Sequence, residues 1–175
     1  MLKVSLKETD YIGLLDKDSY MGHIWAWHWT MRKETLKEVG RTKDVLVCDH
    51  QIARDKVLGN PMMMKEILNG KDLHLITPRK VNLERKKINE VLGCNVTYTE
   101  VPFTCTLEYR DKLLNDINNI KENVVFVGLA VLGKDIPHIL SSRGKVCLDM
   151  GATLDAWGGL VTRPSFTTIH KHCLL

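Results

Sequence analysis

Short apolar runs, separated by polar stretches with helical spacing, dominate the central part of the chain. Five of these runs have the length and the β-branched composition of strands. They occupy residues 45–49 (VLVCD), 73–77 (LHLIT), 96–101 (VTYTEV), 124–128 (VVFVG) and 145–149 (KVCLD). Four of the five are almost continuously apolar, which predicts strands buried on both faces of a sheet.

The segments between these runs have helical patterns. We expect helices over residues 51–68, 81–92, 107–120 and 134–142. Three of them end at residues that terminate helices, namely Asn69-Gly70, Gly93 and Gly144. Upstream of the first run, residues 23–39 predict a further helix and residues 10–16 a shorter one.

Strands that alternate with helices indicate an α/β fold with a parallel sheet. We therefore expect a single Rossmann-like α/β domain over residues 1–175, with a mainly parallel sheet of about five strands flanked by helices. Within it, residues 1–40 would form a helical N-terminal segment, residues 41–160 the parallel-sheet core and residues 161–175 a tail.

Polar, charged and glycine residues follow every predicted strand. They are Asp49-His50, Thr77-Pro78-Arg79-Lys80, Pro102-Phe103-Thr104, Gly128-Leu129-Ala130 and Asp149-Met150-Gly151. In an open parallel sheet, ligands bind outside the carboxyl ends of the strands. We therefore expect Asp49, Arg79, Gly128 and Asp149 to converge at one edge, in a site that binds a phosphate and a sugar.

Each of these features also has a structural interpretation. Either aspartate, Asp49 or Asp149, could cap the turn or helix that follows it. The segment 128–133 (GLAVLG) resembles a phosphate-cradling turn, but it lacks the glycine spacing of a dinucleotide fingerprint or a Walker A loop. Taken by itself, this motif is better explained as a tight strand-to-helix turn. Of the basic cluster 79–87, only Arg79 and Lys80 lie near a strand end.

Composition narrows the class of protein. A formal net charge of +4 fits an anionic ligand, but the charge is too small and scattered to indicate nucleic-acid binding. The five cysteines include no C-x-x-C pair, and Cys48 and Cys147 lie inside apolar runs. We therefore expect buried, reduced cysteines, a cytoplasmic location and no membrane span.

A series of short motifs runs through residues 70–157. In order, they are Gly70-Lys71-Asp72, Gly93-Cys94-Asn95, Val101-Pro102, Gly128-Leu129-Ala130, Arg143-Gly144, Leu148-Asp149-Met150-Gly151 and Leu154-Asp155-Ala156-Trp157. This order resembles the GT-D-type glycosyltransferases, which move a sugar from a nucleotide diphosphate. The resemblance covers roughly half of the chain, and the order of the motifs carries it.

The resemblance implies a protein that transfers or binds the sugar of a nucleotide diphosphate sugar, with an acceptor glycan or glycoprotein as the second partner. It implies that Asp149 contacts sugar hydroxyls or acts as a catalytic base on the acceptor hydroxyl. Together with the strand-end rule, it gives an expected set of substrate-binding residues: Asp49, His50, Arg79, Lys80, Gly128, Leu129, Ala130, Gly151, Asp155 and Trp157.

Two departures from the family pattern limit what it implies. The N-terminal "GDGE", whose D-x-E holds the metal, is absent, and the G-P-T turn is replaced by Gly128-Leu129-Ala130. The chain therefore resembles a diverged or N-terminally shortened member. A divalent metal such as Mn²⁺ or Mg²⁺ has no identified ligands, and catalysis stays open. The alternative is a non-catalytic Rossmann-like module that binds a nucleotide or a protein.

Overall fold

The computed structural model describes residues 11–14, 34, 36–38, 40, 46–49, 60–78, 85–102, 107–129, 133–151 and 153–157. The chain divides into two compact units, Met1–Lys56 and Val57–Leu175, and each is described by itself. The organisation as a single domain over residues 1–175 stays a prediction. Within the described ranges, no helix combines the length and the apolar character needed to cross a membrane.

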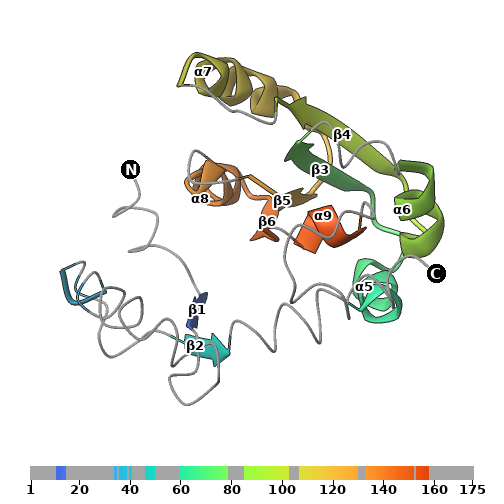
Figure 1. Cartoon of the computed structure of the whole chain (residues 1–175), viewed down its shortest axis with the longest axis horizontal. Coiled ribbons are helices and arrows are strands. Elements are labelled where there is room, and N and C mark those ends of the chain that lie inside the picture. The colour runs from blue at the N-terminus through green and yellow to red at the C-terminus, as the bar shows by residue number, and fades with distance from the viewer. Residues whose placement is uncertain are drawn as a thin grey trace. The chain divides into compact units, whose positions relative to one another are not determined.

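The second unit alternates helices with strands (Figure 1). Its elements are α5 (Pro61–Leu68), β3 (Leu73–Pro78), α6 (Arg85–Leu92), β4 (Val96–Val101), α7 (Leu107–Asp116), the 3-10 turn η3 (Ile117–Asn119), β5 (Val124–Val127), α8 (Ile136–Ser141), β6 (Val146–Asp149) and α9 (Thr153–Trp157). The prediction of an α/β fold is confirmed. The last short helix, α9, is an element that the sequence pattern had not indicated.

The four strands of this unit form one all-parallel sheet in the order β4-β3-β5-β6. The central strand β3 pairs with β4 from Leu73↔Val96 onward and with β5 from Leu73↔Val124 onward. The edge strand β6 then pairs with β5. A parallel sheet with alternating helices is Rossmann-like, as the sequence predicted.

Two apolar cores lie on the two faces of this sheet, and alternation along the strands supplies both. Leu75 and Phe126 belong to the first core, with residues of α5, α6 and α9. Ile76 and Val127, the next positions along the same strands, belong to the second core, with residues of α7, η3 and α8. Figure 1 shows α5, α6 and α9 on one side of the strands and α7 and α8 on the other.

Local signals end the helices where the sequence predicted. Asn60 caps the start of α5, because its side-chain oxygen accepts hydrogen bonds from the backbone N–H groups of Met62 and Met63 at 3.1 and 3.2 Å. Asn69 closes the same helix in the left-handed conformation, with a φ of 44°. Gly93 and Gly144 follow α6 and α8 with positive φ values of 62° and 78°, which glycine adopts without a steric penalty.

The prediction of burial on both faces is wrong for residues 145–149. Val146 and Leu148 are 59% and 38% exposed. Both point to the same face, since they are two residues apart. The physical reason is that, among the described elements, β6 lies at the edge of the sheet and the core on this face includes no residue of β6. Cys147, on the other face, packs against the second core.

The first unit contains a parallel pair of strands, β1 (Tyr11–Leu14) and β2 (Leu46–Asp49). The helix predicted for residues 10–16 is therefore wrong: Tyr11 and Ile12 favour a strand, and Gly13 disfavours a helix. The predicted strand 45–49 forms, but its partner is β1 and it is not hydrogen-bonded into the four-stranded sheet. Residues 34 and 36–38 are helical, inside the predicted helix 23–39.

Candidate functional site

The order of the strands creates a topological switch point between β3 and β5. From β3 the chain passes through α6 to β4 on one side, and it then returns through α7 to β5 on the other side. The connections that leave the carboxyl ends of β3 and β5 therefore run to opposite faces of the sheet. In doubly wound sheets, this is the place where ligands bind.

The carboxyl end of β5 is packed closely against the turn before α9. The backbone N–H of Gly128 donates to the carbonyl oxygen of Ile76 at 2.8 Å, which extends the pairing of β5 with β3. A Cβ atom on Gly128 would lie 2.8 Å from Cδ1 of Leu154 and 3.2 Å from the carbonyl oxygen of Gly151. Glycine is therefore required here for close approach.

Of the segment 128–133, the structure describes Gly128, Leu129 and Gly133. The side chain of Leu129 is buried in the second core. A Cβ atom on Gly133 would lie 2.3 Å from Cβ of Leu129, so the two ends of the turn are in close contact. Residue Ala130 lies outside the described residues. The packing supports the strand-to-helix interpretation of this motif, and a contact between Gly128, Leu129 or Ala130 and a ligand stays a prediction.

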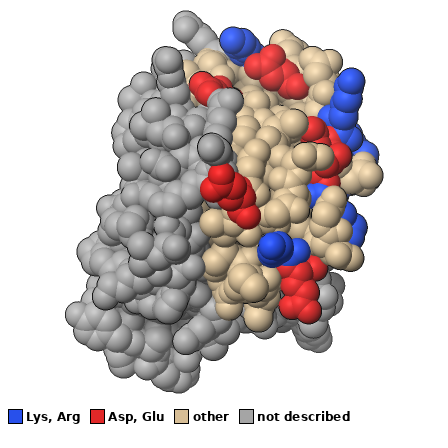
Figure 2. Space-filling view, turned by 90° about the vertical axis from the view of Figure 1, so that its right-hand side faces the viewer, with Lys and Arg blue, Asp and Glu red and all other residues tan. Residues whose placement is uncertain are grey.

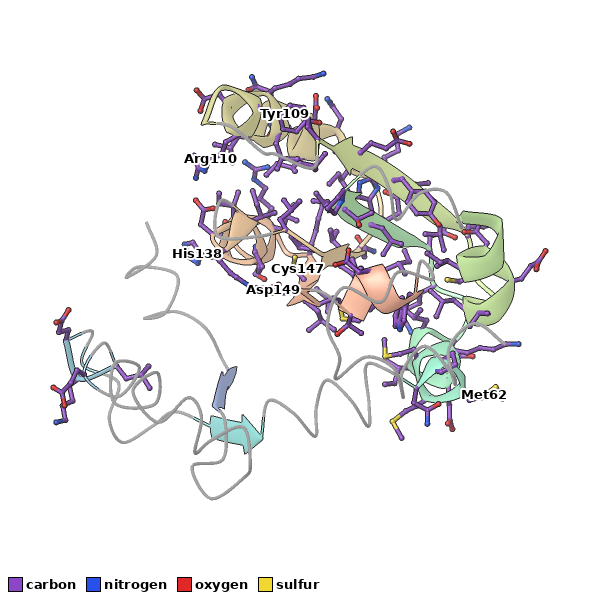
Figure 3. The ribbon with its side chains drawn as sticks, viewed as in Figure 1. Met62, Tyr109, Arg110, His138, Cys147 and Asp149 are labelled. Carbon is purple, nitrogen blue, oxygen red and sulfur yellow. The ribbon has the colours of Figure 1, made fainter. Side chains whose placement is uncertain are left out.

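Asp149 ends β6 and has a partner for each carboxylate oxygen. Its Oδ1 accepts the backbone N–H of Gly151 at 3.0 Å, and its Oδ2 forms an ion pair with Nζ of Lys134. Gly151 has a φ of 51°, so the aspartate stabilises a turn that requires glycine. These contacts fit the capping role that the sequence left open, and a role in catalysis or binding stays a prediction. Figure 3 shows Asp149 and Cys147 together on β6.

The other predicted site residues have separate positions. Asp49 ends β2 in the first unit, so its expected place beside Asp149 stays a prediction. Asp155 is half-buried on α9, and Trp157 is buried, with its ring centroid 6.1 Å from that of Phe126. His50, Arg79 and Lys80 lie outside the described residues.

Burial makes the nearby thiol unreactive. The side chain of Cys147 is partly buried and packs against the second core. Burial raises the pKa of the Cys147 thiol to about 12, and the negative charge of Asp149 adds to the effect. The thiol is therefore protonated near neutral pH, which supports its structural role. The side chain of Cys48 lies outside the described residues.

A chain of hydrogen bonds near the amino ends of β3 and β4 was not identified by the sequence analysis. His74 of β3 is buried, with Nδ1 2.7 Å from Oγ1 of Thr97 and Nε2 2.9 Å from Oγ1 of Thr99. Thr97 also donates to Oε1 of Glu122 at 2.7 Å. Because a carboxylate only accepts, Thr97 must receive its second bond from Nδ1–H of His74, and Nε2 must accept from Thr99.

Burial, rather than the hydrogen bonds, dominates the titration of His74. Burial lowers the pKa of His74, the charge of Glu122 opposes this shift, and the charge of Lys145 adds to it. For Glu122, burial acts to raise the pKa, but hydrogen bonds from Thr97 and the backbone, together with His74, outweigh it and lower the pKa. Alternation in "LHLIT" and "VTYTEV" places these side chains on one face, but only the pairing of β3 with β4 brings them together.

An open pocket of about 590 Å³ lies near the amino ends of β3 and β4. Its lining includes Met62 and Met63 of α5, together with Gly70 and Gly93, which precede the two strands. Figure 3 shows Met62 on the outer side of α5. The pocket is at the other end of these strands from the switch point, so it is separate from the predicted site.

The described part of the second unit contains no cluster of metal-binding side chains. No group of three or more His, Cys, Asp or Glu residues among the described residues could hold a metal ion. Figure 2 shows acidic and basic residues interspersed over the face in view. The described residues therefore include no set of side chains that could hold a divalent metal.

Comparison of the chain with protein families, with curated proteins and with solved structures finds no match.

Gly128→Ala tests the close packing of β5 against α9. We expect a loss of about 1–3 kcal/mol in the free energy of unfolding, because the added methyl group overpacks the contact with Leu154. Leu154→Ala alone should cost about 2–5 kcal/mol, since it leaves a cavity. The free energy of unfolding lost by the double variant should be smaller than the sum of the two single losses, by at least about 0.5 kcal/mol. Urea unfolding measures all three, and strict additivity would contradict the contact.

The hydrogen-bond chain predicts a loss of stability in acid. The pKa of His74 is lowered from 6.5, so the unfolded state takes up a proton that the folded state resists. The free energy of unfolding should therefore be fully retained above pH 6.5 and fall as the pH decreases below it. Urea unfolding from about pH 7.5 to about pH 5.5 measures this. His74→Gln should show a weaker dependence, and equal slopes would refute the assignment.

Proposed function

We propose that this chain binds a nucleotide diphosphate sugar at the carboxyl edge of the four-stranded sheet, as a diverged relative of the glycosyltransferases that it resembles. The observation that carries the proposal is the switch point between β3 and β5. Most of the residues predicted to bind the ligand lie at the ends of these two strands and of the adjacent β6. Topology and the order of the motifs, which are independent arguments, thus point to the same edge.

The predicted roles follow from the chemistry of each strand end. Arg79, which follows β3, would neutralise the charge of the diphosphate, and Gly128 would let it approach the backbone of β5. Asp149 and Gly151, which follow β6, would contact sugar or acceptor hydroxyls. Transfer would break the bond between the anomeric carbon and the diphosphate, join that carbon to an acceptor hydroxyl and pass the hydroxyl proton to Asp149.

One observation favours a second candidate, a binding module without catalysis. Both oxygens of Asp149 already have partners, the N–H of Gly151 and the ammonium of Lys134. To act as the base, Asp149 would have to accept the acceptor hydroxyl in addition to, or in place of, these two partners. Binding without transfer therefore fits this geometry without any rearrangement of the ion pair.

A thermal-shift experiment tests the proposal. Unfolding of the full chain would be followed with UDP, GDP, UDP-glucose and GDP-mannose, each with and without Mn²⁺ or Mg²⁺. A ligand at about one hundred times its Kd should add about 2.7 kcal/mol, which raises Tm by about 5–10 °C in a chain of this size. Release of the nucleoside diphosphate, measured with and without candidate acceptors, separates transfer from binding. No shift with any of the four would remove the proposal.

Asp149→Asn tests the carboxylate. The amide oxygen can still accept the N–H of Gly151, and the partly exposed pair with Lys134 contributes little, so stability should change by less than about 1 kcal/mol. Binding of the nucleotide sugar should weaken about tenfold, because a charged hydrogen bond is lost. Calorimetric titration measures the change.

The matched control is Asp72→Asn. Asp72 precedes β3 at the amino end of the sheet, where its Oδ1 accepts from Nδ2 of Asn95 at 3.0 Å. This substitution should leave ligand binding unchanged. Unchanged binding in Asp149→Asn would exclude the carboxylate from the site, and a much lower Tm with unchanged binding would make its role structural.

A further inference from the structure

Two fully buried hydroxyl groups beside the switch point lack hydrogen-bond partners among the described residues. Thr77 is the penultimate residue of β3 and Thr153 the first residue of α9, and both are 0% exposed. Within the described structure, neither Oγ1 atom has a hydrogen-bond partner, and the same holds for Nε1 of Trp157. Buried polar groups are almost always paired, so unpaired ones at a candidate site require an explanation.

These groups border the same place in the fold. Thr77 is two residues after Leu75, so its side chain lies on the face of the first core, where α9 packs. Gly128 is bonded to Ile76, which places it next to Thr77 across the β3–β5 pair. The contact of Gly128 with Leu154, the residue after Thr153, brings the start of α9 to the same end of the sheet.

We propose that Thr77 and Thr153 recognise ring hydroxyls of a pentose or hexose, and so determine the specificity of the site for a sugar. This inference rests on the proposed function, because it names the part of the nucleotide sugar that these residues would contact. A threonine hydroxyl both donates and accepts, as a sugar hydroxyl does. Nε1 of Trp157 would supply a further donor from α9.

The surroundings favour a neutral sugar over a phosphate at this position. Leu75, Phe126 and Leu154 belong to the core that this face buries, and they carry no charge. Burying a neutral hydroxyl that gains a partner there is much less costly than burying a phosphate anion. Because both hydroxyls are covered in the unliganded chain, the five-residue helix α9 must shift when the ligand binds.

Valine substitutions test the inference, since valine keeps the shape of threonine without the hydroxyl. Thr77→Val and Thr153→Val should maintain or raise the Tm of the unliganded chain, because each removes an unpaired buried polar group. Each should also weaken UDP-glucose or GDP-mannose binding about tenfold, and Thr77→Ser should retain it. Thr99→Val is the matched control: its hydroxyl is bonded to His74, so its loss should lower Tm and leave binding unchanged.

The outcomes separate this inference from the proposed function. A fall in Tm for both valine variants, as in Thr99→Val, would show that the hydroxyls have structural partners and would overturn the inference. Unchanged ligand binding in both valine variants would also overturn the inference. If the parent binds no nucleotide sugar, the proposed function falls, and the variants are measured with ribose 5-phosphate and glucose 1-phosphate. Weaker binding of either to the variants would support the hydroxyl assignment; no binding to the parent would overturn it.

Discussion

The pairing of β3 with β5 brings together two strands that are separated in the chain by α6, β4 and α7. Because β3 is hydrogen-bonded on its other side to β4, it becomes the centre of the sheet and every side chain from Leu73 to Thr77 is buried. Alternation along β3 then gives both helical layers their apolar contacts. The pairing also separates the connections that leave β3 and β5, so the same contact that organises the cores creates the topological switch point.

The elements of this unit could be predicted from the sequence because their signals are local. Asn69-Gly70, Gly93 and Gly144 end helices through left-handed backbone, and the runs in 73–77 and 124–128 are too apolar to be anything but buried. The error at 145–149 has a different origin. A run such as Val146–Leu148 shows the tendency to be buried, but burial depends on which elements cover each face of the strand. At Tyr11–Leu14 the local preferences of Tyr11, Ile12 and Gly13 favour the strand that forms, and the helix prediction did not give them enough weight.

The strand ends of the candidate site could be predicted from the sequence, and the contacts around them could not. The rule for parallel sheets predicts a site at the carboxyl edge, since it needs only the strand ends. It could not show that Lys134 pairs with Asp149, or that the hydroxyls of Thr77 and Thr153 lack partners in the described structure, because both facts depend on side chains packed from other elements. His74 illustrates the same limit. A histidine within "LHLIT" looks like an isolated polar residue, and only the neighbouring strand shows that its nitrogens are both occupied.

Because the thiol of Cys147 is protonated, its rate of reaction can report how often the edge of the sheet opens. Burial raises the pKa of this thiol to about 12, so it is almost entirely protonated near neutral pH while β6 stays in place. When β6 separates from β5, the thiol regains an ordinary pKa and reacts more readily with an alkylating reagent. The rate of Cys147 alkylation therefore reports the opening of this strand. Since β6 carries Asp149 at its end, the same rate reports how often the carboxyl end of β6 loses its arrangement.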